Sequence, residues 1–129
     1  MPASSCRILC IDDHRDSADI LKLLLEDEGH EVVIATNIRD AIALATQESF
    51  DLYVLDRRLP DGTGIELCRQ LVAATPNVPC IFYTGDAYEV NREQALAAGA
   101  EHYIPKPDIG RLIETVTQVL SERECATAG

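Results

Sequence analysis

The chain lacks the two kinds of segment that direct a protein to a membrane or out of the cell. No stretch comes close to the roughly 18 uninterrupted apolar residues that a membrane span requires. The opening residues, Met1-Pro2-Ala3-Ser4-Ser5, contain no basic region followed by a long apolar stretch, so no secretory signal is predicted. We therefore expect a soluble, cytoplasmic protein with no membrane partner.

The sequence is also poor in paired cysteines and in basic residues. Its five cysteines are an odd number without a C-x-x-C pair, so neither a disulfide framework nor a zinc site is predicted. The 11 Lys and Arg residues stand against 22 Asp and Glu, a formal net charge of −11. Because nucleic-acid binding needs a positively charged surface, no direct nucleic-acid partner is expected. The acidity favours basic surfaces or cations as partners, or serves solubility alone.

The chain does contain five short apolar runs that alternate with amphipathic stretches. The runs are Arg7 to Ile11, Glu31 to Ala35, Asp51 to Leu55, Pro79 to Tyr83 and His102 to Ile104. Residues 52–55 and 80–83 show no polar alternation, which is typical of strands covered on both faces of a parallel sheet. Apolar residues at helical spacing lie between the runs, including Ile38, Ala41, Ile42 and Ala45.

This alternation predicts an α/β protein with a flavodoxin-like, doubly wound, five-stranded parallel sheet and helices on both faces. Right-handed crossovers favour the strand order 2-1-3-4-5. Gly29 and Gly99 are expected to end helices. The length of 129 residues predicts a single domain over 1–129, with a core from about residue 6 to 122 and short frayed termini.

Polar residues follow four of the five predicted strands. They are Asp12 and Asp13 after the first, Asp56 after the third, Thr84 after the fourth and Lys106 after the fifth. In a parallel sheet these positions share the carboxyl edge, where open α/β folds bind ligands. Three carboxylates and one ammonium leave a formal charge of −2, which a divalent cation would relieve. Oxygen ligands without thiol or imidazole favour Mg²⁺ over zinc.

Such a site would let Asp56 act as a nucleophile toward a phosphorylated donor and form an aspartyl phosphate. Mg²⁺ and Lys106 would neutralise charge on the transferring oxygens, and the Thr84 hydroxyl would donate to another. Taken singly, each residue has an ordinary alternative. Asp12 and Asp13 could serve a helix N-terminus, and Asp56 could begin a turn. Their joint occurrence at the strand ends favours the phosphoryl site.

The same residues carry a resemblance to a known family. The motifs, in order, are Ile11-Asp12-Asp13, Val54-Leu55-Asp56 with Leu59-Pro60-Asp61-Gly62-Thr63-Gly64, Tyr83-Thr84-Gly85, and Tyr103-Ile104-Pro105-Lys106-Pro107. From roughly residue 7 to 120 the chain resembles the receiver domains of two-component response regulators, of the chemotaxis-regulator kind. The resemblance implies that Asp56 is the phosphoacceptor and that Asp13 and Asp56 bind Mg²⁺ directly. It also implies that Asp12 acts through water and that the backbone carbonyl of Arg58 is a further ligand.

The resemblance further implies how the domain works. Thr84 and Tyr103 would form the switch pair, and the fourth helix, fifth strand and fifth helix would form the face that binds a downstream protein. The Lys106-Pro107 peptide would be cis. The phosphoryl group would come from a histidine kinase or a histidine phosphotransfer protein. The chain would be a monomer or a phosphorylation-dependent homodimer, and not an enzyme beyond its own phosphoryl transfer and dephosphorylation. It could stand alone or belong to a longer protein.

Some residues depart from the usual family pattern. Gly85 stands where many receivers have alanine, and Arg57 and Arg58 add positive charge beside the acceptor. We expect Asp86 to pair with Arg58 and screen the phosphoryl group from water. His14 is expected to be exposed and not to be a ligand.

Two alternatives remain in view. One is a phosphatase with an aspartyl nucleophile, but such enzymes usually place a second aspartate two residues later, where this chain has Arg58. The other is a pseudo-receiver that binds partners without being phosphorylated, against which the complete set of acids, threonine and lysine argues.

Overall fold

The computed structural model describes residues 6–85 and 88–122. One parallel sheet has the order β2-β1-β3-β6-β7. Its strands are β1 (Arg7–Ile11), β2 (Glu31–Ala35), β3 (Leu52–Leu55), β6 (Cys80–Thr84) and β7 (His102–Pro105). Two very short strands, β4 (Arg58–Leu59) and β5 (Gly62–Thr63), form a separate antiparallel hairpin. The predicted order 2-1-3-4-5 is therefore confirmed when the hairpin is left out of the count.

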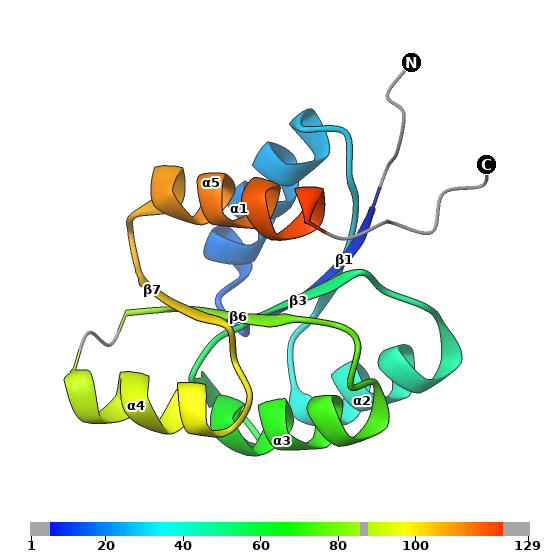
Figure 1. Ribbon diagram of the computed structural model, residues 1–129. Coiled ribbons are helices and arrows are strands. Elements are labelled where there is room, and N and C mark those ends of the chain that lie inside the picture. Colours follow the sequence, from blue (N-terminus) through cyan, green and yellow to red (C-terminus); the bar gives the residue numbers. More distant parts are fainter. Residues whose placement is uncertain (1–5, 86–87, 123–129) are drawn as a thin grey trace.

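Five helices cover the two faces of the sheet. Figure 1 shows α1 (Arg15–Asp27) and α5 (Ile109–Ser121) on one side of the sheet. On the other side lie α2 (Ile38–Gln47), α3 (Gly64–Ala74) and α4 (Glu89–Ala97). Every residue of β3 and β6 is buried, because each of these central strands has helices above and below it. The burial of both faces explains why the sequences of β3 and β6 show no polar alternation, as was predicted.

The helices begin and end at residues suited to those positions. The side chains of Asn37, Thr63 and Asp108 accept hydrogen bonds from backbone N–H groups in the first turns of α2, α3 and α5. Gly29 and Gly99 follow α1 and α4 with φ of 96° and 116°, a conformation that glycine adopts without a Cβ penalty. Both expected helix ends are confirmed.

The cysteines differ from the expectation in one respect. Cys6 is disulfide-bonded, whereas Cys10, Cys68 and Cys80 are buried free thiols and so are not its partners. Cys125 and the termini that were expected to fray lie outside the described residues. Within residues 6–85 and 88–122, no helix is both long enough and apolar enough to cross a bilayer.

Candidate functional site

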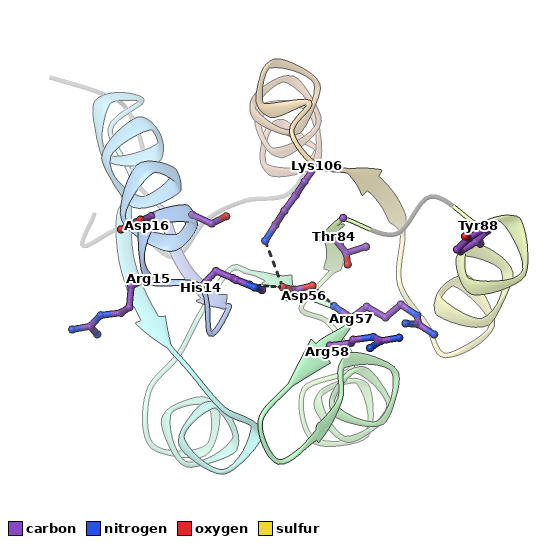
Figure 2. Close-up of a pocket in the computed structure, with 11 residues that line it drawn as sticks. His14, Arg15, Asp16, Asp56, Arg57, Arg58, Thr84, Tyr88 and Lys106 are labelled. Carbon is purple, nitrogen blue, oxygen red and sulfur yellow. Dashed lines mark hydrogen bonds and ion pairs between the residues drawn. The ribbon is translucent and has the colours of Figure 1, made fainter.

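The sheet brings three distant side chains together at its carboxyl edge. Asp12 follows β1 and Asp56 follows β3, and each residue is only 5% exposed. Lys106, directly after β7, places its Nζ 2.7 Å from Asp12 Oδ2 and 3.5 Å from Asp56 Oδ2. The ammonium therefore lies against both buried carboxylates, and Figure 2 shows Lys106 reaching down to Asp56.

Asp56 lies in a surface cavity of about 830 Å³. The cavity walls include Thr84 from the end of β6, Lys106, and the two arginines that follow Asp56. The residues predicted from the ends of the third, fourth and fifth sheet strands thus line one cavity. A space of this size leaves room for a phosphoryl group to reach the carboxylate.

A third acid, Asp13, lies close to Asp12 and Asp56. One ligand atom from each of Asp12, Asp13, His14 and Asp56 can be chosen so that all four lie within 4.8 Å of one another. Three converging carboxylates face one ammonium, so the cluster has an excess of negative charge. Its oxygen donors are the kind that Mg²⁺ prefers, and the residues present therefore fit a divalent cation.

His14 is more closely involved with the acids than the sequence indicated. Its side chain is 69% exposed, as expected, yet its Nδ1 lies 3.2 Å from Asp12 Oδ1 and 3.4 Å from Asp13 Oδ1. The backbone N–H of His14 also donates to Asp12 Oδ1 at 2.9 Å. The ring therefore lies at the rim of the site with one nitrogen turned toward the carboxylates.

Burial and ion pairing oppose each other in the pKa values of the Asp12 and Lys106 pair. Burial alone would raise the pKa of Asp12, but hydrogen bonds from Lys106 and His14 bring it below its ordinary value. Burial alone would lower the pKa of Lys106, but its contacts with Asp12 and Asp56 raise it overall. Both groups are consequently charged near neutral pH, and a fixed ammonium stands beside Asp56.

The loop after β3 holds the Asp56 carboxylate in place. The backbone N–H of Asp56 donates to the carbonyl of Ile11 at 3.0 Å, and the N–H of Arg57 donates to Asp56 Oδ1 at 2.6 Å. Gly64 packs directly on this loop, where an added Cβ would overlap the carbonyl oxygen of Asp56. The Thr63-Gly64 part of the motif therefore has a steric role that spacing alone did not reveal.

The hairpin that follows Asp56 is tied to α2. The two carboxylate oxygens of Asp61 accept hydrogen bonds from the backbone N–H groups of Ile38 at 2.8 Å and Arg39 at 3.1 Å. These bonds lower the pKa of Asp61. Gly62 lies so close to Ile38 that a Cβ would meet its Cδ1 at 2.7 Å. The sequence indicated only a turn at these residues. The contact of this turn with α2 could not be predicted, because it depends on the tertiary fold.

Thr84 and Tyr103 lie on the neighbouring strands β6 and β7. Thr84 is 3% exposed and Tyr103 is 6% exposed. The Tyr103 ring stacks on Phe82 with 5.9 Å between ring centroids. The backbone N–H of Lys106 donates to the carbonyl of Thr84 at 2.7 Å, and the Lys106-Pro107 peptide is cis. The end of β7 is therefore joined directly to the threonine that lines the cavity.

The two arginines after Asp56 have different surroundings. Arg57 Nη2 donates to Asn91 Oδ1 in α4 at 3.2 Å, a contact that sequence reasoning missed because nothing in the spacing indicates it. Arg58 is exposed and lines the cavity. Asp86, the expected partner of Arg58, lies outside the described residues.

Comparison with known proteins agrees with this architecture. Residues 8–117 match the family described as the response regulator receiver domain. The transcriptional regulatory protein ResD of Bacillus subtilis is 34% identical over 122 residues, covering 95% of this chain and 50% of ResD. The chain spans about half the length, or less, of curated relatives such as ResD.

Solved structures give the same result. A CheY-like receiver domain protein from Methanospirillum hungatei superposes with a TM-score of 0.87 at 38% identity, covering 92% of this chain and 96% of that one. The response regulator TrrA of Thermotoga maritima, solved in complex with Mg²⁺ and BeF, has a TM-score of 0.81 at 29% identity, covering 89% of this chain and 99% of TrrA. With a family match over residues 8–117 and an acidic pocket at the carboxyl edge of its sheet, this chain belongs to the response regulator receiver domains of two-component signalling.

Proposed function

We propose that Asp56 accepts a phosphoryl group from a histidine kinase or a histidine phosphotransfer protein. The observation that carries this proposal is the convergence of buried Asp12 and Asp56 on the Lys106 ammonium, at 2.7 and 3.5 Å, where Asp56 and Lys106 line a surface cavity. In the transfer, an oxygen of the Asp56 carboxylate forms a bond to phosphorus while the bond between phosphorus and the donor imidazole breaks. The electron pair of that bond stays with the imidazole nitrogen.

The residues around Asp56 have separate tasks in this proposal. Asp13 and Asp56 would bind Mg²⁺ directly, Asp12 would bind it through water, and the backbone carbonyl of Arg58 would be a further ligand. An ion held there would supply positive charge against the phosphoryl oxygens. Lys106 stabilises another of these oxygens with its fixed ammonium, and the Thr84 hydroxyl donates to a third. The solved structure of the similar protein TrrA, in complex with Mg²⁺ and BeF, supports an ion of this kind.

The proposed output runs through Thr84 and Tyr103. A phosphoryl group carries about −1.5 to −2 charges and adds acceptor oxygens, so it draws the Thr84 hydroxyl toward Asp56. Tyr103 lies on β7, the strand that pairs with the strand of Thr84. When Thr84 moves, the Tyr103 ring changes its packing, and this alters the α4-β7-α5 face. That face then binds a downstream protein, with the domain acting as a monomer or as a phosphorylation-dependent dimer. The proposal includes the cytoplasmic location and the single-domain organisation expected from the sequence.

Phosphoryl transfer to the purified chain tests this function. Incubation with Mg²⁺ and a small phosphodonor should add one phosphoryl group, measured by intact-protein mass spectrometry, and EDTA should prevent it. Asp56→Asn should abolish the gain in mass. Asp51→Asn is a matched control, because Asp51 is also a buried aspartate but lies directly before β3, at the opposite end of the strand. Phosphorylation that survives Asp56→Asn, or is lost equally in both variants, contradicts the proposal.

A further inference from the structure

We infer that His14 is a direct ligand of the metal ion, so that this receiver gains affinity for imidazole-accepting ions such as Co²⁺ relative to Mg²⁺. The inference rests on the metal site of the proposed function and changes its ligand set from oxygen alone to oxygen and nitrogen. It starts from the orientation of one exposed ring whose Nδ1 faces three carboxylates.

The distances around Nδ1 match those between ligands of one ion. His14 Nδ1 lies 3.2 Å from Asp12 Oδ1, 3.4 Å from Asp13 Oδ1 and 3.6 Å from Asp56 Oδ2. Ligands about 2.1 Å from a metal are about 3.0 Å apart along an octahedral edge and about 3.4 Å apart along a tetrahedral edge. A single ion can therefore contact Nδ1 and the carboxylates with little movement of the side chains.

The contacts of the ring are with the acids of the cluster, and an ion bound to Nδ1 would replace the proton that this nitrogen shares with Asp12 Oδ1 at 3.2 Å. His14 precedes the first residue of α1, but its side chain makes no capping hydrogen bond to the helix. Its backbone N–H holds Asp12 Oδ1, which fixes the start of the helix beside the acid. Lys106 contacts the other oxygen of Asp12, Oδ2, so the ammonium and the imidazole do not compete for the same atom of that carboxylate.

A nitrogen ligand changes which ions the site prefers. Mg²⁺ is a hard cation that favours oxygen, whereas imidazole is a good ligand for first-row transition metals. Loss of an outer-shell group typically weakens metal binding about 10–100-fold, so loss of a direct ligand should weaken it at least tenfold. The expected effect of removing His14 is therefore large for Co²⁺ and small for Mg²⁺.

Metal binding to His14→Ala tests the inference, with His102→Ala as the matched control. His102 is also exposed, but it lies at the amino end of β7, away from the acidic cluster. Pulsed electron paramagnetic resonance of bound Mn²⁺ should show coupling to a ¹⁴N nucleus in the wild type and in His102→Ala, and none in His14→Ala. Calorimetric titration should show Co²⁺ affinity falling about tenfold or more in His14→Ala, with Mg²⁺ affinity changing less than about threefold.

The outcomes separate this inference from the proposed function. Mn²⁺ that binds the wild type without nitrogen coupling overturns the role of His14, as does an equal loss of Co²⁺ and Mg²⁺ affinity in His14→Ala. If Mg²⁺-dependent phosphorylation of Asp56 persists in such a case, the proposed function stands. A wild-type protein that binds neither Mg²⁺ nor Mn²⁺ overturns both.

Discussion

Replacing Asp56 by asparagine should stabilise the fold when no divalent cation is present. The ligand atoms of Asp12, Asp13 and Asp56 lie within 4.8 Å of one another. At an effective dielectric constant of about 20, the repulsion between the Asp56 carboxylate and either of the other two carboxylates costs at least about 3.5 kcal/mol. The two repulsions together cost about 7 kcal/mol. The attraction to Lys106 at 3.5 Å returns about 4.7 kcal/mol. The remaining repulsion is about 2 kcal/mol.

Two features refine this magnitude. The Asp13 side chain is 36% exposed, so solvent weakens its share, and we expect a net gain of about 1 to 2 kcal/mol for Asp56→Asn. An asparagine side-chain oxygen still accepts the hydrogen bond from the Arg57 N–H, which limits the loss of other contacts. The charge repulsion should therefore dominate the change in stability.

Urea unfolding followed by circular dichroism measures this effect. In EDTA the variant should unfold at a higher urea concentration than the wild type. Added Mg²⁺ should narrow the gap, because an ion that binds the native wild type stabilises it by mass action. Asp51→Asn makes the same change in net charge at the opposite end of β3 and should bring no gain, since the Asp51 carboxylate accepts a hydrogen bond from the Arg7 N–H at 2.8 Å. An Asp56→Asn protein no more stable than the wild type in EDTA refutes the reasoning.

Further predictions concern the supports of the site and of the sheet. Gly64→Ala should cost about 3 kcal/mol in urea unfolding, because the new Cβ meets the backbone of Asp56 rather than a movable side chain, and an unchanged midpoint would contradict this. Asp61→Ala should destabilise the protein above pH 3.8, where the unfolded carboxyl is already ionised. Because folding lowers the pKa of Asp61, the difference in unfolding free energy between variant and wild type should shrink as the pH falls through the folded pKa, which lies below 3.8. A difference that grows in acid would argue against the hydrogen bonds that Asp61 accepts at the start of α2. Tyr53→Phe removes the 2.9 Å contact between the tyrosine hydroxyl and Thr75, so thermal unfolding should show a loss of about 1 kcal/mol, and a stabilised variant would be inconsistent with that bond.

Much of the fold followed from the sequence because a parallel sheet leaves a strong pattern. The fully apolar runs at residues 52–55 and 80–83 indicated strands covered on both faces, and the structure buries them on both. The same topology puts the ends of the strands at one edge, so residues as far apart as Asp12 and Lys106 could be predicted to meet before any distance was known.

The contacts that hold the site could not be predicted in this way. The hydrogen bonds that Asp61 accepts from α2 and that Arg57 donates to Asn91 join loops and helices that meet only in the folded chain. The orientation of His14 depends on the first turn of α1, and periodicity says nothing about where one ring nitrogen points. The disulfide at Cys6 shows the same limit, because spacing in the sequence does not reveal which cysteines the fold brings together.

The most direct test of the account is to identify the phosphorylated residue. Wild-type protein treated with Mg²⁺ and a phosphodonor can be reduced with borohydride, which marks an acyl phosphate irreversibly, and then digested for peptide mass spectrometry. We predict the mark on Asp56 alone, and its loss when Mg²⁺ is replaced by EDTA. A mark on Asp12, Asp13 or another acid, or no mark under conditions in which the protein binds Mg²⁺, would contradict the central claim.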